Sequence, residues 1–181
     1  GFAMALAGGL VLAIMRRSRR WFLFGPASVF VECVRSTPLL VQAYFLFFVL
    51  PRFGLTMSPW TTGILAIGMY YSCYASEAYR AGLESVPKGQ WEAATALNFS
   101  VYRTYRDVVL PQALKPTVPV LGNYLIQMFK DTPILAAITV PELPPTAKVI
   151  GADTFRFTEP YTMVGALFLT LSLLSAAVIR F

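Results

Sequence analysis

Ionisable residues interrupt the apolar stretches of this sequence at three places. Glu32 and Arg35 stand in one stretch, Glu77 stands in another, and Lys130 is followed at once by Asp131 in a third. An ionisable side chain at the centre of a membrane helix costs about 2.5–3.5 kcal/mol on insertion scales, so such residues usually have a function or a specific partner. The chemistry open to them is recognition of a charged solute or pairing with one another.

Lys130 and Asp131 together suit a zwitterionic solute, which needs a donor for its carboxylate and an acceptor for its ammonium group. Pro133 predicts a helix break beside them. Asn123, Gln127 and Lys130 follow at spacings of four and three, so they share one helix face. We hypothesise that these residues line or gate a pathway, and an ion pair buried between helices is the open alternative. The full set assigned to a substrate pathway or gate is Arg35, Thr37, Gln42, Glu77, Asn123, Gln127, Lys130, Asp131 and Thr132.

Two of the charged positions also predict local ion pairs. Glu32 and Arg35 are three residues apart, as are Glu77 and Arg80, and this spacing places both partners on one helix face. Pairs of this kind near the end of a span set the position of a helix. A gate around Thr37-Pro38 is the alternative for the first pair, because a proline leaves one backbone carbonyl free for a ligand or water.

Several kinds of chemistry are missing from the sequence. It contains no histidine, and Cys33 and Cys73 lie in separate apolar segments with no CxxC motif. Because no metal-ligand cluster and no nucleophile–base spacing occurs, we expect neither a metal site nor an enzyme active site. No GxxxxGK[ST] motif occurs either, so the chain has no P-loop for ATP. We expect no cofactor in this chain.

The composition indicates a membrane protein. The chain has 181 residues, of which 56% are hydrophobic and only 13% charged, whereas soluble domains carry about 25% charged residues. The net charge of +6 does not indicate nucleic-acid binding, because the basic residues cluster between apolar runs instead of forming a stripe. We therefore expect a lipid bilayer around the chain.

The predicted fold class is all-α, a polytopic helical membrane protein with five transmembrane helices. The first apolar stretch is too short for a hydrocarbon core, which needs about 20 residues, and we interpret it as the inner end of a truncated span. We also expect the chain to be cut short at Arg180-Phe181. The stretches are Phe2–Met15, Val29–Leu50, Trp60–Tyr79, Pro116–Ile138 and Tyr161–Ile179.

Lysine and arginine in the connections predict the orientation. One side would hold Arg16, Arg17, Arg19, Arg20, Arg80, Lys88, Arg103, Arg106, Lys115 and Arg180, and the other only Arg52, Lys148 and Arg156. Since cytoplasmic loops carry the excess of positive charge, we expect the first side to be cytoplasmic, the N-terminus outside and the C-terminus inside.

Residues 80–115 form the dominant cytoplasmic insertion of what we expect to be a single domain over residues 1–181. Pro87 and Gly89 predict a turn, and Gln90 to Leu97 a short helix that Asn98 ends in a left-handed conformation. Ser100 then caps a second helix, Val101 to Leu110, which Pro111 closes. In the first helix Ala93, Ala94 and Leu97 predict a small apolar ridge, which suits a groove in another protein.

The motif in this insertion resembles the EAA loop of permeases from ABC importers. That loop has EAA, three residues, glycine, nine residues, isoleucine, one residue and Leu-Pro, and the chain matches the spacing with Asn98 for the glycine and Val108 for the isoleucine. Further segments resemble permeases for polar amino acids: Arg35–Gln42, Pro87–Ala94, Leu110–Ala113, Gly122-Asn123 and Lys130–Thr132. The two prolines Pro144 and Pro145 depart from that resemblance.

The resemblance implies a permease subunit of the bacterial inner membrane that moves polar amino acids into the cell. Short coupling helices would dock onto ATPase subunits through Gly89, Glu92, Ala93, Ala94, Leu97 and Asn98. It also implies a second permease chain, identical or related, and an external solute-binding protein. ATP and Mg²⁺ would be bound by the ATPase.

Two alternatives remain open. The segment Phe155–Pro160 resembles permeases for compatible solutes of the ectoine type. Glu77 and Asp131 would also suit an ion-coupled secondary transporter, although such proteins often have related halves and we detect no internal repeat.

Overall fold

A computed structural model describes residues 1–180, without the side chains at 178 and 180, so Phe181 and the charge of Arg180 lie outside it. The described residues contain α-helices joined by short 3₁₀ and π segments, and no strand. The α-helices are α1 (Phe2–Arg17), α2 (Trp21–Arg35), α3 (Leu39–Tyr44), α4 (Pro59–Glu84), α5 (Lys88–Ala96), α6 (Val101–Arg103), α7 (Leu110–Asp131), α8 (Leu143–Thr154) and α9 (Thr158–Arg180). The other segments are η1 (Phe45–Val49), η2 (Leu50–Phe53), η3 (Thr104–Val109) and η4 (Thr132–Ile138). The all-α fold class is therefore confirmed.

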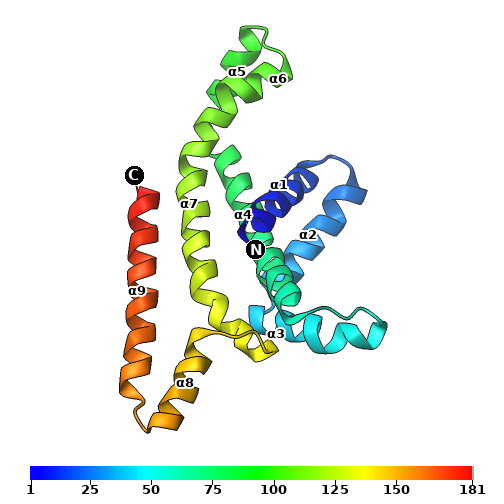
Figure 1. Cartoon of the computed structure of the whole chain (residues 1–181). Helices are drawn as coiled ribbons and strands as arrows, with labels where there is room; N and C mark the ends of the chain where they lie inside the picture. The colour runs from blue at the N-terminus through cyan, green and yellow to red at the C-terminus, as the bar shows by residue number, and fades with distance from the viewer. Residues whose placement is uncertain (181) are drawn as a thin grey trace.

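Helices α4 and α7 are the long central elements, and they carry α5 and α6 at one end (Figure 1). Their 26 and 22 residues correspond to roughly 39 and 33 Å at the α-helical rise. The turn between α1 and α2 lies towards the same end in Figure 1, whereas α8 lies at the opposite end beside the start of α9. The chain thus separates a projecting helical tip from a broad base.

Small residues bring α1 and α4 into close contact. A Cβ atom added at Gly9 would stand 2.6 Å from the Cβ of Ala75 and 2.9 Å from the carbonyl oxygen of Ser72. Only glycine fits at this separation, and small residues at helix contacts are the usual means of packing membrane helices. Ala5 is also buried in this contact. Helix α1 is thereby fixed against the middle of α4.

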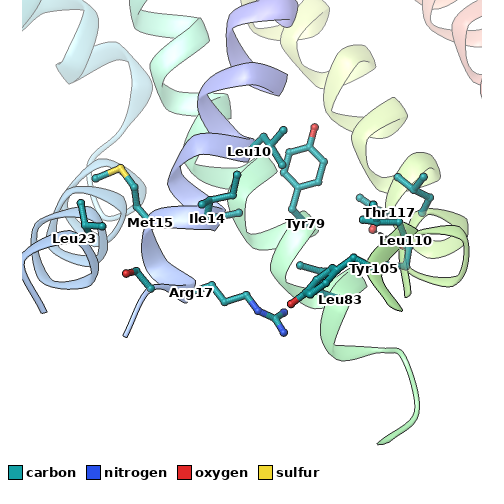
Figure 2. A pocket seen from close by; sticks show the side chains of 14 residues that line it. Leu10, Ile14, Met15, Arg17, Leu23, Tyr79, Leu83, Tyr105, Leu110 and Thr117 are labelled. Atoms are coloured by element: carbon teal, nitrogen blue, oxygen red, sulfur yellow. Dashed lines mark hydrogen bonds between the residues drawn. The ribbon is translucent and has the colours of Figure 1, made fainter. Parts of the chain in front are cut away.

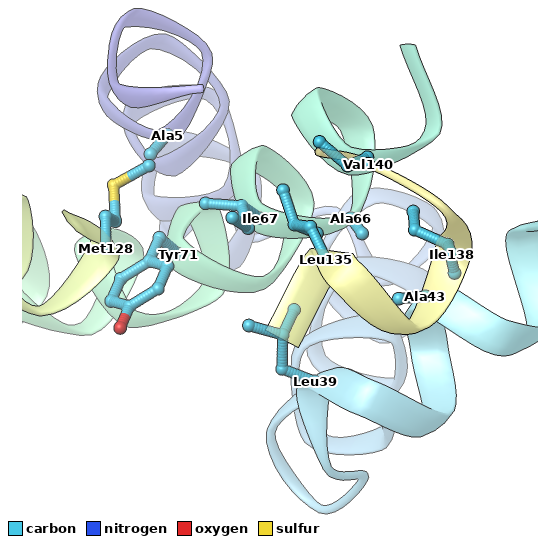
Figure 3. Close-up of a cluster of buried hydrophobic side chains, with 10 residues drawn as sticks. All are labelled: Ala5, Leu39, Ala43, Ala66, Ile67, Tyr71, Met128, Leu135, Ile138 and Val140. Carbon is cyan, nitrogen blue, oxygen red and sulfur yellow. The ribbon is translucent and has the colours of Figure 1, made fainter. Parts of the chain in front are cut away.

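The main apolar cluster joins α1, α3, α4, α7 and η4 near the base of the molecule (Figure 3). Ile138 and Ala43 are completely buried in it, and Tyr71 is 3% exposed. These residues come from positions as far apart as Ala5 and Val140. The cluster holds α1, α3, η4 and the end of α7 around α4.

The predicted continuous span Val29–Leu50 is wrong. Helix α2 ends at Arg35, and the chain from Leu39 to Phe53 is bent by 107° relative to it. Pro38 explains the break, because proline disfavours a helical conformation in the residue before it and donates no hydrogen bond. The chain therefore forms a broken helical pair at this place.

The prediction that Pro111 ends a helix from Val101 to Leu110 is also wrong. After α6 the chain forms η3, a π-helical segment, and continues directly into α7. The Leu110 N–H donates to the carbonyl of Tyr105, five residues earlier. Pro111 then lies in the first turn of α7, where its missing N–H is tolerated.

The remaining boundaries agree in part. The predicted span Pro116–Ile138 begins earlier, at Leu110, and its helix changes to a 3₁₀ form at Thr132, beside the predicted break. Pro144 and Pro145, for which the sequence offered no account, lie in the first turn of α8. Among the described residues Thr158–Ala177 is long and apolar enough for a span, as are α2 and Leu39–Phe53 taken as one bent pair. The number of five spans stays a prediction.

Candidate functional site

Glu77 on α4 is the centre of an ion-pair cluster. Its Oε1 accepts from Arg16 Nη1 at 2.7 Å and from Arg35 Nη1 at 3.1 Å, and its Oε2 accepts from Arg80 Nε at 2.9 Å. The side chains of Glu77 and Arg16 are only 18% and 13% exposed. One carboxylate therefore connects α1, α2 and α4, and the cluster keeps an excess of positive charge.

The prediction for Glu77 and Arg80 is confirmed, but the predicted pair between Glu32 and Arg35 is wrong. Arg35 donates across the helix interface to Glu77 instead, and its guanidinium lies 5.3 Å from the ring centroid of Tyr74. Glu77 is less exposed than Glu32, so water screens its charge less, and the Tyr74 face beside it adds a cation–π contact for the guanidinium.

Gln42 fills the break between α2 and α3. Its Nε2 donates to the carbonyl of Val34 at 2.7 Å and to that of Thr37 at 2.9 Å, and the residue is 8% exposed. Val34 is the residue whose carbonyl Pro38 leaves without a helical donor. The expectation that Pro38 frees a carbonyl for a ligand is thus wrong, because the Gln42 amide occupies it. The hydroxyl of Thr37 donates to the carbonyl of Cys33.

We predict that Gln42→Leu lowers thermal stability. The Thr37 carbonyl would lose this donor and the Val34 carbonyl would keep only the N–H of Thr37, at 3.4 Å, at a cost of about 1–3 kcal/mol. The change should appear as a lower unfolding midpoint of the detergent-purified protein. Gln127→Leu is the matched control, because Gln127 is exposed on α7. Equal midpoints for the two variants would contradict this role of Gln42.

A cluster of tyrosines adjoins the ion pairs. Tyr71 donates its hydroxyl to Oδ2 of Asp131 at 2.6 Å. The rings of Tyr70, Tyr74 and Tyr124 lie within 4.9–6.2 Å of one another or of Tyr71, measured between centroids. The tyrosine cluster therefore links Asp131 on α7 to the Arg35 guanidinium over Tyr74, and it presents aromatic faces and a carboxylate together.

The side chains of Lys130 and Asp131 contact different parts of the structure. Asp131 contacts Tyr71 on α4, whereas Lys130 lines a cavity of about 450 Å³ with Pro144 of α8 and Phe168 of α9. No ion pair involves either residue among the described side chains. Asn123, Gln127 and Lys130 are exposed, and the Thr132 hydroxyl donates to the carbonyl of Phe129. The structure thus brings Arg35, Glu77 and Asp131 close together, but it leaves Asn123 and Gln127 on the outside of α7.

The projecting tip has the local geometry that the sequence predicts. Asn98 is left-handed, with φ of 56°. The N–H of Phe99 donates to the Ala94 carbonyl at 3.0 Å and that of Asn98 to the Thr95 carbonyl at 2.9 Å, which is the Schellman pattern. The hydroxyl of Ser100 accepts from the N–H of Arg103. The turn from α5 to α6 is therefore closed by its own hydrogen bonds.

The exposed surface of this tip differs from the predicted ridge. Ala94 is only 2% exposed and faces the chain, so it adds nothing to the ridge. Gly89, Glu92 and Ala93 are exposed. Leu97 is 67% exposed, and two neighbouring apolar residues, Val101 and Tyr102, are 75% and 69% exposed. We call Leu97, Val101 and Tyr102 the tip surface.

Arg16 and the tyrosines were not predicted as site residues. Arg16 was counted only as one of four arginines in a connection, although it makes the shortest ion pair to Glu77. The tyrosines had a signal, because Tyr70, Tyr71 and Tyr74 recur on α4 at spacings that return to one face.

Comparisons with known proteins agree with one another. The pattern of a protein family described as "Binding-protein-dependent transport system inner membrane component" matches residues 5–181. A "probable amino-acid ABC transporter permease protein" of Sinorhizobium fredii is 42% identical over 99% of this chain and 78% of its own. The glutamine transport system permease protein of Escherichia coli is 35% identical over 98% and 84% of the two chains. A crystal structure of an amino acid ABC transporter with histidines matches with a TM-score of 0.93 and 33% identity, over 99% of this chain and 84% of that one.

Proposed function

We propose, because this chain belongs to the family of binding-protein-dependent transport system inner membrane components, that it is the permease subunit of an ATP-driven ABC importer for polar amino acids. The names of the related proteins support the class of solute, since they give amino acids in general and glutamine in particular. Hydrolysis of ATP belongs to a separate subunit, which agrees with the missing P-loop motif.

The projecting tip is the observation that carries this proposal. It places three exposed apolar side chains at the end of the two longest central helices, away from the rest of the chain. A helix presenting an apolar surface of this kind fits a groove in a partner protein. Movement of such a partner would be transmitted along α4 and α7 to the ion pairs and tyrosines between them.

The proposed assembly follows from this role. The chain is a single domain in which residues 80–115 dock onto the ATPase through Gly89, Glu92, Ala93, Leu97 and Asn98, with Ala94 supporting them from inside. The assembly also contains two ATPase subunits, which bind ATP and Mg²⁺. A second permease chain and an external solute-binding protein complete the transporter. The chain would lie in the bacterial inner membrane with its N-terminus outside and its C-terminus in the cytoplasm.

The tyrosine cluster is the proposed place of contact with the solute. The faces of Tyr70 and Tyr74 and the Asp131 carboxylate attract an ammonium group, and the Arg35 guanidinium attracts a carboxylate. The two charges of an amino acid would thus meet complementary groups on neighbouring helices. Asn123, Gln127 and Lys130 of α7 and Thr132 of η4 would line the pathway. Thr37 and Gln42 would support it from the break after α2.

Uptake by the reconstituted transporter tests the proposed function. The full-length chain is placed in liposomes with its ATPase and binding protein, and radiolabelled glutamine, histidine and ectoine are offered with ATP or with an ion gradient. We expect uptake of an amino acid that requires ATP inside the liposomes. Uptake of ectoine alone would reassign the solute, and uptake driven by an ion gradient without ATP would refute the proposal.

Asp131→Asn is predicted to lower this uptake at least tenfold. The variant keeps the shape of the side chain and its hydrogen bond with Tyr71 but removes the negative charge for the ammonium group. The apparent affinity and maximal rate of uptake are measured with equal amounts of assembled transporter. Asp153→Asn, an exposed residue of α8, is the matched control. Normal uptake by the Asp131 variant would contradict the proposed contact.

A further inference from the structure

A cavity of about 650 Å³ lies between α1, α2, α4 and the η3–α7 junction, apart from the proposed solute contact (Figure 2). Its walls are almost entirely aliphatic or aromatic, with leucines contributed by several helices, and none of the lining residues is acidic. Four of the large apolar lining residues are substantially exposed: Ile14 at 63%, Leu10 at 49%, Leu114 at 47% and Leu110 at 43%. The cavity is therefore open along one side.

The rim of the cavity is polar and basic. Figure 2 shows the Arg17 side chain extended along this rim towards Tyr105. Its guanidinium carbon lies 5.6 Å from the Trp91 ring centroid and 5.8 Å from that of Tyr105. Stacking occupies only the face of the group, so the N–H donors at its edge remain available. Ser18 also lines the cavity, and its Oγ accepts from the Arg20 N–H while keeping its own hydrogen to donate.

The charge at the rim is uncompensated. Among the described side chains, no carboxylate forms an ion pair with Arg17, Arg19 or Arg20. Arg16, by contrast, turns inward to Glu77. The Arg17 cation thus stands at the mouth of an apolar cavity, with Arg19 and Arg20 following it closely along the chain. Basic pockets between membrane helices suit anionic lipid headgroups.

We propose that this cavity binds an anionic phospholipid, with one acyl chain between α1, α4 and α7 and the phosphate on Arg17 and Ser18. The aliphatic walls lack the polar groups that would hold a hydrophilic solute, whereas an acyl chain needs none. The bound phosphate fixes the Arg17 guanidinium over Trp91 and Tyr105. Because Trp91 belongs to α5, the lipid also steadies the projecting tip against α1.

Lipid binding to the assembled transporter tests the proposal directly. The full complex is placed in nanodiscs of phosphatidylcholine containing either phosphatidylglycerol or more phosphatidylcholine, and bound lipid is counted by native mass spectrometry after release. We expect phosphatidylglycerol to be retained at least tenfold more than phosphatidylcholine by the unaltered protein.

Two variants separate the headgroup from the acyl chain. Arg17→Gln should abolish the preference for phosphatidylglycerol, and Ala13→Phe, which fills the cavity, should remove retained lipid of both kinds. Arg52→Gln, a basic residue of η2, is the control and should behave as the unaltered protein. Equal retention of the two lipids by the unaltered protein, or retention unaffected by Ala13→Phe, would overturn the proposal. Crosslinks between two permease chains from Ala13→Cys would do so as well, because a second copy would then occupy the cavity.

Discussion

Replacement of Glu77 by glutamine is expected to destabilise the transporter more than any other change of a single charge in this chain. Arg16 would remain 13% exposed without its carboxylate, and Arg35 and Arg80 would lose the same partner. Removing one partner of a buried ion pair costs about 3 kcal/mol or more. For a chain of this size that corresponds to a fall in the unfolding midpoint of roughly 6–12 °C. Uptake should fall with it, since α1, α2 and α4 would lose their common contact.

Glu84→Gln is the control for this effect. Glu84 also pairs with Arg80, at 2.8 Å, but its side chain is 60% exposed. Exposed pairs contribute about 0–1 kcal/mol, so the midpoint should fall by less than roughly 4 °C. Both midpoints are measured by intrinsic fluorescence of the detergent-purified complex. A Glu77 variant as stable as the Glu84 variant would show that the cluster is not what joins these helices.

Leu97→Asp is expected to abolish ATP-driven uptake while leaving the permease folded. Leu97 is the tip-surface residue that follows α5 as its C-cap, and its exposure means that the isolated chain loses little stability by the change. A charge in the centre of an apolar interface costs about 2 kcal/mol or more, which is on the order of a 30-fold loss of affinity for the partner. Binding of the purified ATPase subunit to the permease in nanodiscs measures this loss.

Leu55→Asp is the matched control for the tip surface. Leu55 is 59% exposed and lies between η2 and α4, at the base of the molecule. The same substitution at this position should leave the affinity for the ATPase unchanged. Asn98→Gly should also preserve binding, since glycine adopts the left-handed conformation of Asn98 without strain. Unchanged affinity of the Leu97 variant would exclude this surface from the interface.

Local chemistry explains which parts of the fold were predictable. Asn98 and Ser100 end and begin helices through hydrogen bonds to residues three to five positions away, so the sequence contains the whole interaction. The pair of Glu77 and Arg80 is local in the same sense. Pro38 indicates a break in the sequence, but what occupies the Val34 carbonyl there depends on Gln42. This residue belongs to the next helix, α3, and its side chain supplies a donor in place of the missing Pro38 N–H.

The candidate site was less predictable, because its contacts join distant residues. Arg35 has an acidic neighbour three positions away, yet it pairs with Glu77, 42 positions along the chain. Asp131 likewise contacts Tyr71, 60 positions earlier. Such choices depend on how α1, α2 and α7 pack around α4, and side-chain spacing within one helix does not contain that information. The burial of Ala94 was not predicted for the same reason, since it depends on which residues pack against α5.

Site-specific crosslinking from position 97 tests the central claim most directly, namely that the tip surface meets an ATPase in the cytoplasm. A Leu97→Cys variant in a Cys33→Ser background is expressed with its ATPase in intact cells, and a bifunctional thiol reagent is added. We expect a crosslink to a single cysteine placed in the ATPase, and no labelling of position 97 by a membrane-impermeant maleimide from outside. Labelling from outside, or efficient transport with no such crosslink, would contradict the account.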